Sequence, residues 1–188
     1  LESRQTLQAH LQDFARLLVR QPVPAVGLHA EAAVQPFGAE CVAPAGRLAG
    51  LKLRLRNGYL RGALGYRLSP AWTAARWLVP LVFPGHRLAF DSAVRHLRLP
   101  TPGARLLDVG CGGGDFLDQA RALGWDVTGV EVDTAAAAVA GARGLEVTQA
   151  PLERAGLTPA SFDAITLNHV IEHLHDPRAT LGEAHRLL

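Results

Sequence analysis

A run of glycines between two carboxylates is the feature of this sequence that points most directly to chemistry. The segment DVGCGGGD, from Asp108 to Asp115, follows a short apolar stretch and precedes residues with helical spacing. Glycines let a ligand approach the backbone without obstruction by side chains, and the first turn of a helix presents free N–H groups to that ligand. The segment therefore predicts a binding turn for a small molecule.

Two classes of ligand use such a turn, dinucleotides and S-adenosylmethionine, and their charges differ. The dinucleotide fingerprint G-x-G-x-x-G/A begins at Gly110 and Gly112, but its last position falls on Asp115. A carboxylate there would face the pyrophosphate, and like charges a few Å apart destabilise a desolvated site. S-adenosylmethionine carries a sulfonium and an ammonium and no phosphate, so Asp108 and Asp115 are compatible with it. The pattern therefore favours S-adenosylmethionine. This preference holds also if the main role of Asp115 is to cap the helix.

A further carboxylate ends the next apolar segment, VTGVEVD, where Glu131 lies 21 residues after Gly110. An acid about 20 residues beyond a glycine turn commonly binds the two ribose hydroxyls of a nucleotide. Asp133 is the competing candidate, but its position suits the N-cap of a helix starting near Thr134. We therefore predict that Glu131 is the ribose ligand.

The segment NHVIEHLHD, residues 168–176, contains three histidines and the pattern H-x-x-E-H formed by His169, Glu172 and His173. This pattern occurs in zinc proteases, where it lies on one long helix. Here it directly follows an expected strand and soon meets Pro177, so we predict no metal site. His169 is the nearest candidate for a general base, and the alternative is that His169 and His173 only hydrogen-bond within the loop.

Strands alternating with helices must position these residues. Apolar runs predict strands at 105–109, 126–132, 145–148 and 162–167, and helical spacing appears at 115–123, at 134–143 and from Pro177 onward. Such alternation is typical of βαβ units and a parallel sheet, so the expected fold class is α/β.

Three motifs together resemble a known family. LLDVGCGGGDFL, VTGVEVD and SFDAITLNHVIEHLHDP are similar to the class I S-adenosylmethionine-dependent methyltransferases, and the small-molecule branch with the ubiquinone-biosynthesis O-methyltransferases is the most similar. The resemblance covers residues 86–188 and implies a Rossmann-like sheet, of whose usual seven strands four are present here. It also implies a methyl transfer from S-adenosylmethionine to an O, N or C atom of a small-molecule or lipid-like acceptor.

The resemblance also implies a set of cofactor contacts. The residues expected to line the methionine moiety are Asp108, Gly110 and Gly112; Glu131 would hold the ribose; Ala150 and Leu152, with Gln149 and Pro151, would border the adenine; and Asn168 would lie near the reacting methyl. The family often has an acid beside the adenine amino group, whereas Gln149 and Ala150 are neutral.

Residues 1–85 are expected to form a helical or irregular extension, which could cap the domain at 86–188. Helical spacing appears at 3–20, 71–79 and 87–98, and residues 21–50 are typical of a linker or irregular loop. The alternation of Lys52, Arg54 and Arg56 with leucines favours a half-buried strand, and a helix is the alternative because Arg and Leu also form helices. Core packing is the expectation for the stripe of Trp72, Trp77 and Phe83, and contact with a hydrophobic substrate or a membrane is the alternative.

Charge and composition limit the classes that remain. Residues 1–100 carry 13 Arg or Lys against 5 Asp or Glu, whereas residues 101–188 carry 6 against 12. The basic half indicates either a solvated helix face or an anionic partner such as a membrane surface; no nucleic acid is expected. Two cysteines and the lack of an apolar run of membrane-spanning length favour a cytoplasmic enzyme.

The chain lacks Met and stops within the helix expected from Pro177, so we expect a fragment of a longer protein. Two other functions remain open: a nicotinamide or nucleotide-sugar enzyme on the same fold, and a cofactor-binding module without catalysis.

Overall fold

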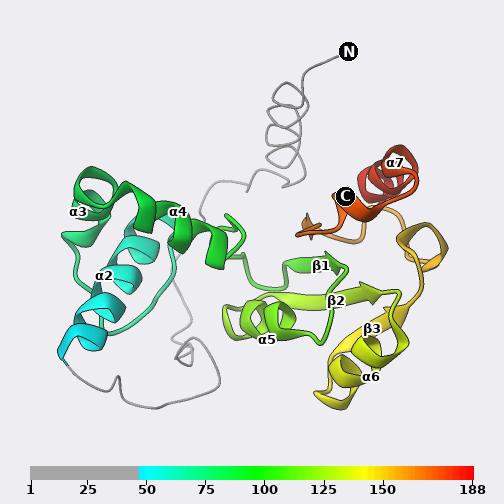
Figure 1. Ribbon diagram of the computed structural model, residues 1–188, viewed down its shortest axis with the longest axis horizontal. Helices are drawn as coiled ribbons and strands as arrows, with labels where there is room; N and C mark the ends of the chain where they lie inside the picture. The colour runs from blue at the N-terminus through cyan, green and yellow to red at the C-terminus, as the bar shows by residue number, and fades with distance from the viewer. Residues whose placement is uncertain (1–46) are drawn as a thin grey trace. The chain divides into compact units, whose positions relative to one another are not determined.

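The computed structural model describes residues 47–188 (Figure 1). Contacts divide these residues into two units. The sheet unit comprises Ala104–Asp118 and Asp126–Leu188, and the helical unit comprises residues 47–103 together with Gln119–Trp125. The expected division into an extension at 1–85 and a methyltransferase domain at 86–188 stays a prediction.

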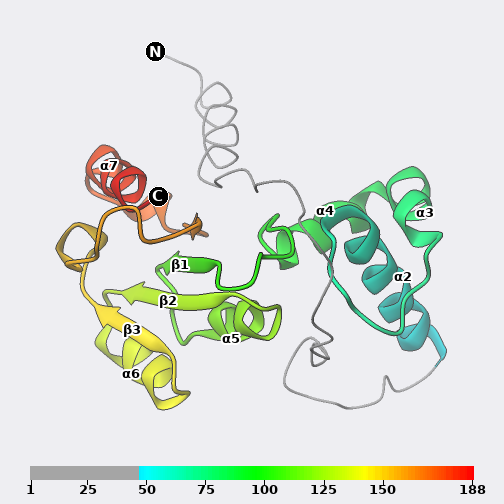
Figure 2. The ribbon, with the colours of Figure 1, turned by 180° about the vertical axis from the view of Figure 1, so that it is seen from behind.

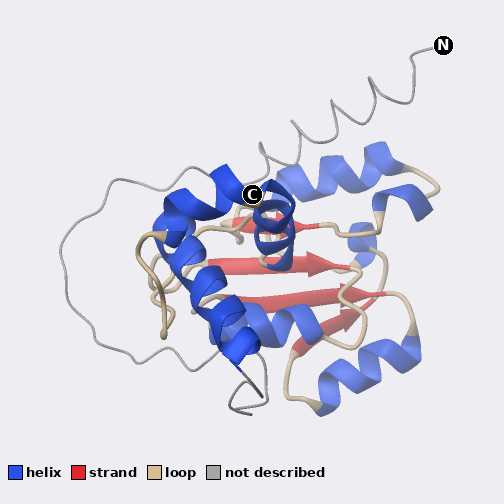
Figure 3. Ribbon diagram, turned by 60° about the vertical axis from the view of Figure 1, so that its left-hand side comes forward, coloured by secondary structure: helices blue, strands red, loops and turns tan. Residues whose placement is uncertain are grey.

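Four parallel strands form the sheet unit's centre (Figure 3). They are β1 (Arg105–Val109), β2 (Asp126–Glu131), β3 (Glu146–Gln149) and β4 (Ala164–Thr166), in the order β3-β2-β1-β4. The chain runs outward from β1 to β3 and then returns to the opposite side of β1. Ligands of open α/β sheets bind at the carboxyl ends of the strands beside such a reversal, which here lies between β1 and β4.

The helices of this unit begin where the sequence supplies a cap. Helix α5 (Asp115–Ala122) follows the glycine turn, and α6 (Thr134–Ala142) begins after Asp133, whose carboxylate accepts a 2.7 Å hydrogen bond from the Ala136 N–H. Helix α7 (Pro177–Leu187) is capped in the same way by Asp176. Two 3-10 turns, η1 (Leu152–Arg154) and η2 (Ile171–His173), precede it. The predicted N-cap role of Asp133 is confirmed.

Successive side chains of each strand point to opposite faces of the sheet. Leu107 and Val109 of β1 pack in one buried cluster with Leu187 of α7. Gly129 of β2 faces the other way, where a Cβ would lie 2.8 Å from Leu117 of α5. The sheet is therefore covered on both faces, which explains why β1, β2 and β4 are buried along almost their whole length.

The helical unit contains α2 (Arg47–Leu64), α3 (Ala75–Val82) and α4 (Pro84–Ala93), shown from behind in Figure 2. Helix α2 packs against the start of α3 through its glycines: a Cβ on Gly58 would lie 1.9 Å from the Trp72 carbonyl oxygen. The Tyr59 hydroxyl donates a 2.9 Å hydrogen bond to the buried carboxylate of Asp91. Burial and this hydrogen bond raise the pKa of Tyr59.

The four strands, their alternation with helices and the α/β class are confirmed, and β1 has the predicted bounds. The prediction of a strand around Lys52 is wrong, because this segment lies within α2. Leu51 is exposed and Leu53 and Leu55 are only half-buried, so the alternating leucines do not form a buried strand face. Arg and Leu are strong helix formers, which favours the helix.

Other predicted segments have different bounds in the structure or lie outside the described residues. The predicted helices at 71–79 and 87–98 are instead Ala75–Val82 and Pro84–Ala93, and the predicted linker ends earlier, because α2 begins at Arg47. The expected helix at 3–20 and most of the linker lie outside residues 47–188. The prediction that Trp72, Trp77 and Phe83 pack in the core is wrong, because Trp77 is 70% exposed. Within residues 47–188 no helix has the length and apolarity needed to cross a bilayer.

Candidate functional site

The glycine turn joins β1 to α5 at the carboxyl edge of the sheet. Gly110 has φ +68°, a conformation that favours glycine, and its N–H donates a 2.7 Å hydrogen bond to the Val130 carbonyl. The Asp108 side chain is fully buried at the end of β1, where it accepts a 2.7 Å hydrogen bond from the Thr166 hydroxyl of β4. This bond ties together the two strands that flank the reversal.

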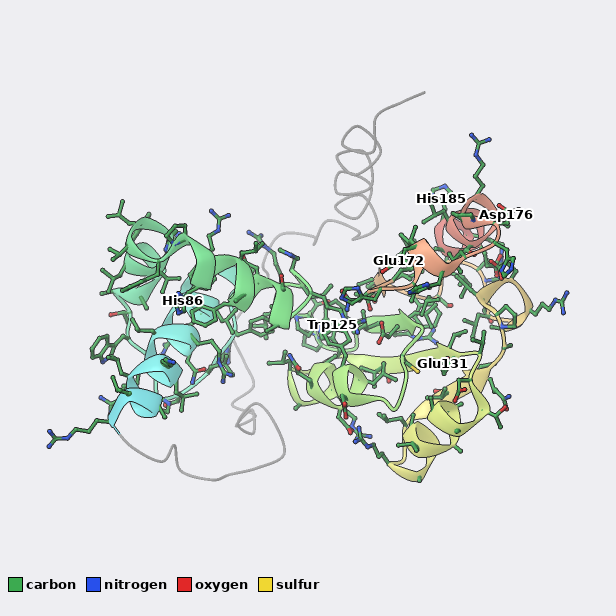
Figure 4. All side chains as sticks on the ribbon, in the orientation of Figure 1. His86, Trp125, Glu131, Glu172, Asp176 and His185 are labelled. Carbon is green, nitrogen blue, oxygen red and sulfur yellow. The ribbon has the colours of Figure 1, made fainter. Side chains whose placement is uncertain are left out.

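Glu131 ends β2 beside this turn and is labelled in Figure 4. One carboxylate oxygen accepts a 2.8 Å hydrogen bond from the Gly112 N–H, and the other accepts bonds of 2.8 and 2.9 Å from the Val132 and Asp133 N–H groups. An ionised carboxylate offers about four acceptor positions, so one remains for a ligand hydroxyl. Glu131 thus holds the glycine turn in place, a role that its position in the sequence did not reveal.

A cavity of about 660 Å³ opens at this edge of the sheet unit. Of the predicted site residues, those that line it are Gly110, Glu131, Ala150, Leu152, Pro151 and His169. The predicted residues that do not line it are Asp108, Gly112, Gln149 and Asn168, although each lies within three residues of the carboxyl end of a strand. This volume lies in the range of pockets that hold nucleotide-sized molecules.

The charge of the lining separates ligand classes. Glu131, Glu153 and Asp176 contribute three carboxylates, and the cavity's lining contains no Arg or Lys. Apolar residues supply most of the remaining wall, among them Val109, Val130 and Leu152, and three histidines complete it with Thr180. A cavity with this lining suits a positively charged ligand with an apolar part, and it offers no Arg or Lys to a diphosphate.

The structure corrects one step of the electrostatic argument. Asp115 is the first residue of α5, and its carboxylate is 91% exposed and paired with the Arg143 guanidinium. This pairing raises the pKa of Arg143. Asp115 therefore does not face the cavity, and the carboxylates that do are Glu131, Glu153 and Asp176.

The loop after β4 brings histidines to the same cavity. His169 has φ +57°, and its Nδ1 lies 3.3 Å from a carboxylate oxygen of Glu172. A hydrogen bond from its own backbone N–H, and then the contact with His169, hold the pKa of Glu172 below its ordinary value. Glu172 and Asp176 are labelled in Figure 4. Among residues 47–188 no three His, Cys, Asp or Glu side chains converge as metal ligands would.

The sequence did not indicate the contribution of Val170 or of α7 to this cavity. A Cβ on Gly110 would lie 2.5 Å from Cγ2 of Val170, so this side chain covers the glycine turn. Thr180 of α7 donates a short hydrogen bond to Glu153 and fixes that carboxylate at the cavity wall. The Asp176-Pro177 pair was the available signal, since it marks the start of a helix at the cavity.

Curated relatives match the same part of the chain. A ubiquinone biosynthesis O-methyltransferase from Xanthomonas oryzae pv. oryzae is 38% identical over 109 residues, which are 54% of this chain and 44% of the relative. The protein of that name from Xanthomonas campestris pv. campestris is 37% identical over 98 residues, 48% of this chain and 41% of the relative. The chain thus spans less than half the length of these relatives.

Among solved structures, an S-adenosylmethionine-dependent methyltransferase from Mesorhizobium loti is similar at 26% identity and a TM-score of 0.46, covering 52% of this chain and 47% of that one. The model of a methyltransferase domain family matches residues 85–188, which are more than half of the chain. This match confirms the resemblance that the three motifs indicated, and the chain belongs to this family of methyltransferase domains.

Proposed function

We propose that this protein binds S-adenosylmethionine at the carboxyl edge of its sheet and transfers the methyl group to a small-molecule or lipid-like acceptor. The observation that carries the proposal is the cavity lined by three carboxylates and by no Arg or Lys, directly beside a glycine turn held by Glu131. Family membership supports the reaction class. When bound, the cofactor supplies a methyl group that its sulfonium has already activated.

The residues of the cavity fit the cofactor's parts. Ala150, Pro151 and Leu152 form an apolar wall suited to the adenine ring, and Glu131 keeps an acceptor position for a ribose hydroxyl. Gly110 lines the cavity where the methionine moiety is proposed to bind, and Asp108 is buried at the end of the preceding strand. Asn168, next to His169, is proposed to lie near the reacting methyl. These residues would act mainly by binding and alignment, which suffices for much of the rate of an in-line transfer.

His169 is the proposed base for the acceptor's proton. It lines the cavity and contacts Glu172, whose lowered pKa keeps it ionised near neutral pH and able to stabilise an imidazolium. The printed name of the curated relatives favours an oxygen of the acceptor as the methylated atom. A location in the cytoplasm is also proposed, supported by a sequence with two cysteines, too few for a disulfide framework.

Calorimetric titration with S-adenosylhomocysteine tests the binding half of the proposal. We expect saturable binding of S-adenosylhomocysteine and none of NADH, because the cavity has no Arg or Lys to pair with the diphosphate. Glu131→Gln should weaken binding by about 1–3 kcal/mol through lost hydrogen bonds. Asp133→Asn is the matched control: it keeps an N-capping side chain two residues away and should leave the affinity unchanged.

The two roles of Glu131 can be separated with the 2′-deoxyribose analogue of S-adenosylhomocysteine. If Glu131 binds the ribose, the losses from Glu131→Gln and from the missing hydroxyl are not additive; if it only holds the turn, they add. Preferred binding of NADH would contradict the proposal.

Transfer of a labelled methyl group into an extract of small molecules and lipids tests the catalytic half. The expected result is incorporation by the wild type, and at least a ~100-fold lower rate for His169→Ala with unchanged S-adenosylhomocysteine affinity. Binding without any transfer would identify the chain as a cofactor-binding module.

A further inference from the structure

Helix α3 carries its apolar residues on the side that faces solvent. Ala75 and Val79, four residues apart, are buried against the helical unit, with exposures of 0% and 1%. Trp77 and Leu81 lie on the opposite side of this helix and are 70% and 82% exposed. A surface helix normally directs polar side chains outward, whereas α3 carries large apolar side chains on its outward side as well as apolar residues on its buried side.

The exposed apolar surface continues from α3 into α4. Every residue from 81 to 89 is exposed. We call the resulting surface the α3–α4 face, and its large apolar members are Trp77, Leu78, Leu81, Val82, Phe83 and Leu88. His86, labelled in Figure 4, lies within it and packs edge-on against Phe83 at 5.7 Å. A contiguous apolar patch of this kind marks a site of interaction.

The charge around this face has a single sign. Residues 47–103 contain ten Arg or Lys and one acid, Asp91, which is buried and accepts hydrogen bonds from Tyr59. Asp91 also lies 3.6 Å from the Arg87 guanidinium, whose side chain is still 60% exposed. Within this range the exposed basic residues are Arg47, Lys52, Arg54, Arg61, Arg67, Arg76, Arg87 and Arg98. The Arg76 guanidinium lies 4.9 Å from the ring centroid of Trp77, so cation and indole stand together at the edge of the face. No exposed carboxylate within residues 47–103 offsets this charge.

These observations favour one class of partner. A second copy of the chain would bring two strongly basic surfaces together, which like-charge repulsion opposes. Nucleic acid would use the arginines but not the exposed Leu81, Val82 and Leu88. A membrane surface with anionic lipids uses both, because Trp and Leu enter the boundary between headgroups and acyl chains while Arg binds lipid phosphates.

We propose that the α3–α4 face docks the protein on membrane surfaces that contain anionic lipids. Trp77 and Leu81 insert into the interface, and Arg76 and Arg87 remain at headgroup level. The proposal goes beyond methyl transfer and is independent of the cavity in the sheet unit. Should the acceptor be lipid-like, docking would bring the enzyme to the surface in which that acceptor is dissolved.

Vesicle flotation of the full chain tests the proposal. The two vesicle types are phosphatidylcholine alone, and three parts phosphatidylcholine with one part phosphatidylglycerol. We expect binding to the second type only, weakening as salt is raised. The double variant Trp77→Ser with Leu81→Ser should bind at least ~10-fold more weakly, because two large apolar side chains no longer enter the lipid.

Val139→Ser is the matched control, because Val139 is a 50% exposed apolar residue on α6 of the sheet unit. It should bind the vesicles as the wild type does. The double variant removes only exposed side chains, and unchanged circular dichroism and S-adenosylhomocysteine affinity would show that it is folded.

Three results would overturn the proposal. They are no binding to the anionic vesicles, equal binding to both vesicle types, and unchanged binding by the double variant. A dimer of the wild type that the double variant loses in size-exclusion chromatography would assign the face to a second copy instead.

Discussion

The glycine turn and the loop after β4 approach each other at Gly110 and Val170. The Val170 side chain lies over the Gly110 backbone, at the place where this glycine lines the cavity. Val170 follows His169, so the same loop carries the proposed base. The packing of one methyl group on one glycine therefore sets the spacing between the cofactor turn and the proposed catalytic loop.

Alanine substitutions at two neighbouring glycines should have different effects. Gly110→Ala and Gly112→Ala both place a side chain at positive φ, +68° and +56°, which costs about 1–2 kcal/mol. Only Gly110→Ala also directs its Cβ to 2.5 Å from Val170, whereas no atom lies within 4 Å at Gly112. We expect Gly110→Ala to lose at least ~10-fold more affinity for S-adenosylhomocysteine in calorimetric titration.

The double variant Gly110→Ala with Val170→Ala supplies the check. It should recover part of the lost affinity, because it removes the methyl group that collides. Equal losses for Gly110→Ala and Gly112→Ala would show that the contact with Val170 does not matter.

At the scale of elements, α2 and α3 pack through glycine. Gly58 of α2 faces the backbone of Trp72, and Gly62, one turn later, faces the side chain of Arg76. Glycine disfavours a helix, so its presence at both positions reflects the close approach of the following segment.

Gly58→Ala should destabilise the protein although alanine is the better helix former. The gain of about 1 kcal/mol in helix propensity is outweighed, because the new Cβ would lie 1.9 Å from a backbone oxygen that cannot move away alone. We expect a net loss of about 1–3 kcal/mol in urea unfolding followed by circular dichroism. Gly182→Ala in α7, where nothing lies within 4 Å, should instead stabilise by about 0.5–1 kcal/mol. A stabilising Gly58→Ala would contradict the packing.

Elements of the sheet unit were predictable because their signals are local. β1 is an apolar run closed by a glycine turn, and α6 begins at a capping Asp133. Helix α2 was not predictable in this way, since a period of two in leucine and arginine is compatible with a strand and only packing excludes it. Gly110, Glu131, Ala150 and Leu152 were found at the cavity because each lies at or just after the end of a strand.

The rest of the site depends on tertiary contacts. Glu153 and Thr180 are 27 positions apart and meet only because α7 packs on η1. The anchoring of the Gly112 N–H by Glu131 likewise arises from the side chain folding back over the turn. No local pattern in the sequence encodes either contact.

At the scale of the whole molecule, charge and similarity divide along the chain. The family match begins at residue 85, whereas the basic and apolar α3–α4 face belongs mainly to residues that precede it. The proposed methyl transfer is thus assigned to the sheet unit, and the proposed membrane docking to the helical unit. The partner and acceptor are therefore to be sought through residues 47–103 as much as through the cavity.

The fluorescence of Trp125 can report on the folding of the helical unit, although Trp125 lies outside residues 47–103 in the sequence. It is only 7% exposed and belongs, with the rest of Gln119–Trp125, to the contacts of the helical unit. A fragment of residues 86–188 would keep nearly the whole family match but lose residues 47–85 of that unit. Its Trp125 emission should shift to the red relative to the full chain carrying Trp72→Phe and Trp77→Phe, and an unshifted spectrum would show that other residues bury the indole. The emission of Trp125 would thus report whether residues 47–103 are folded.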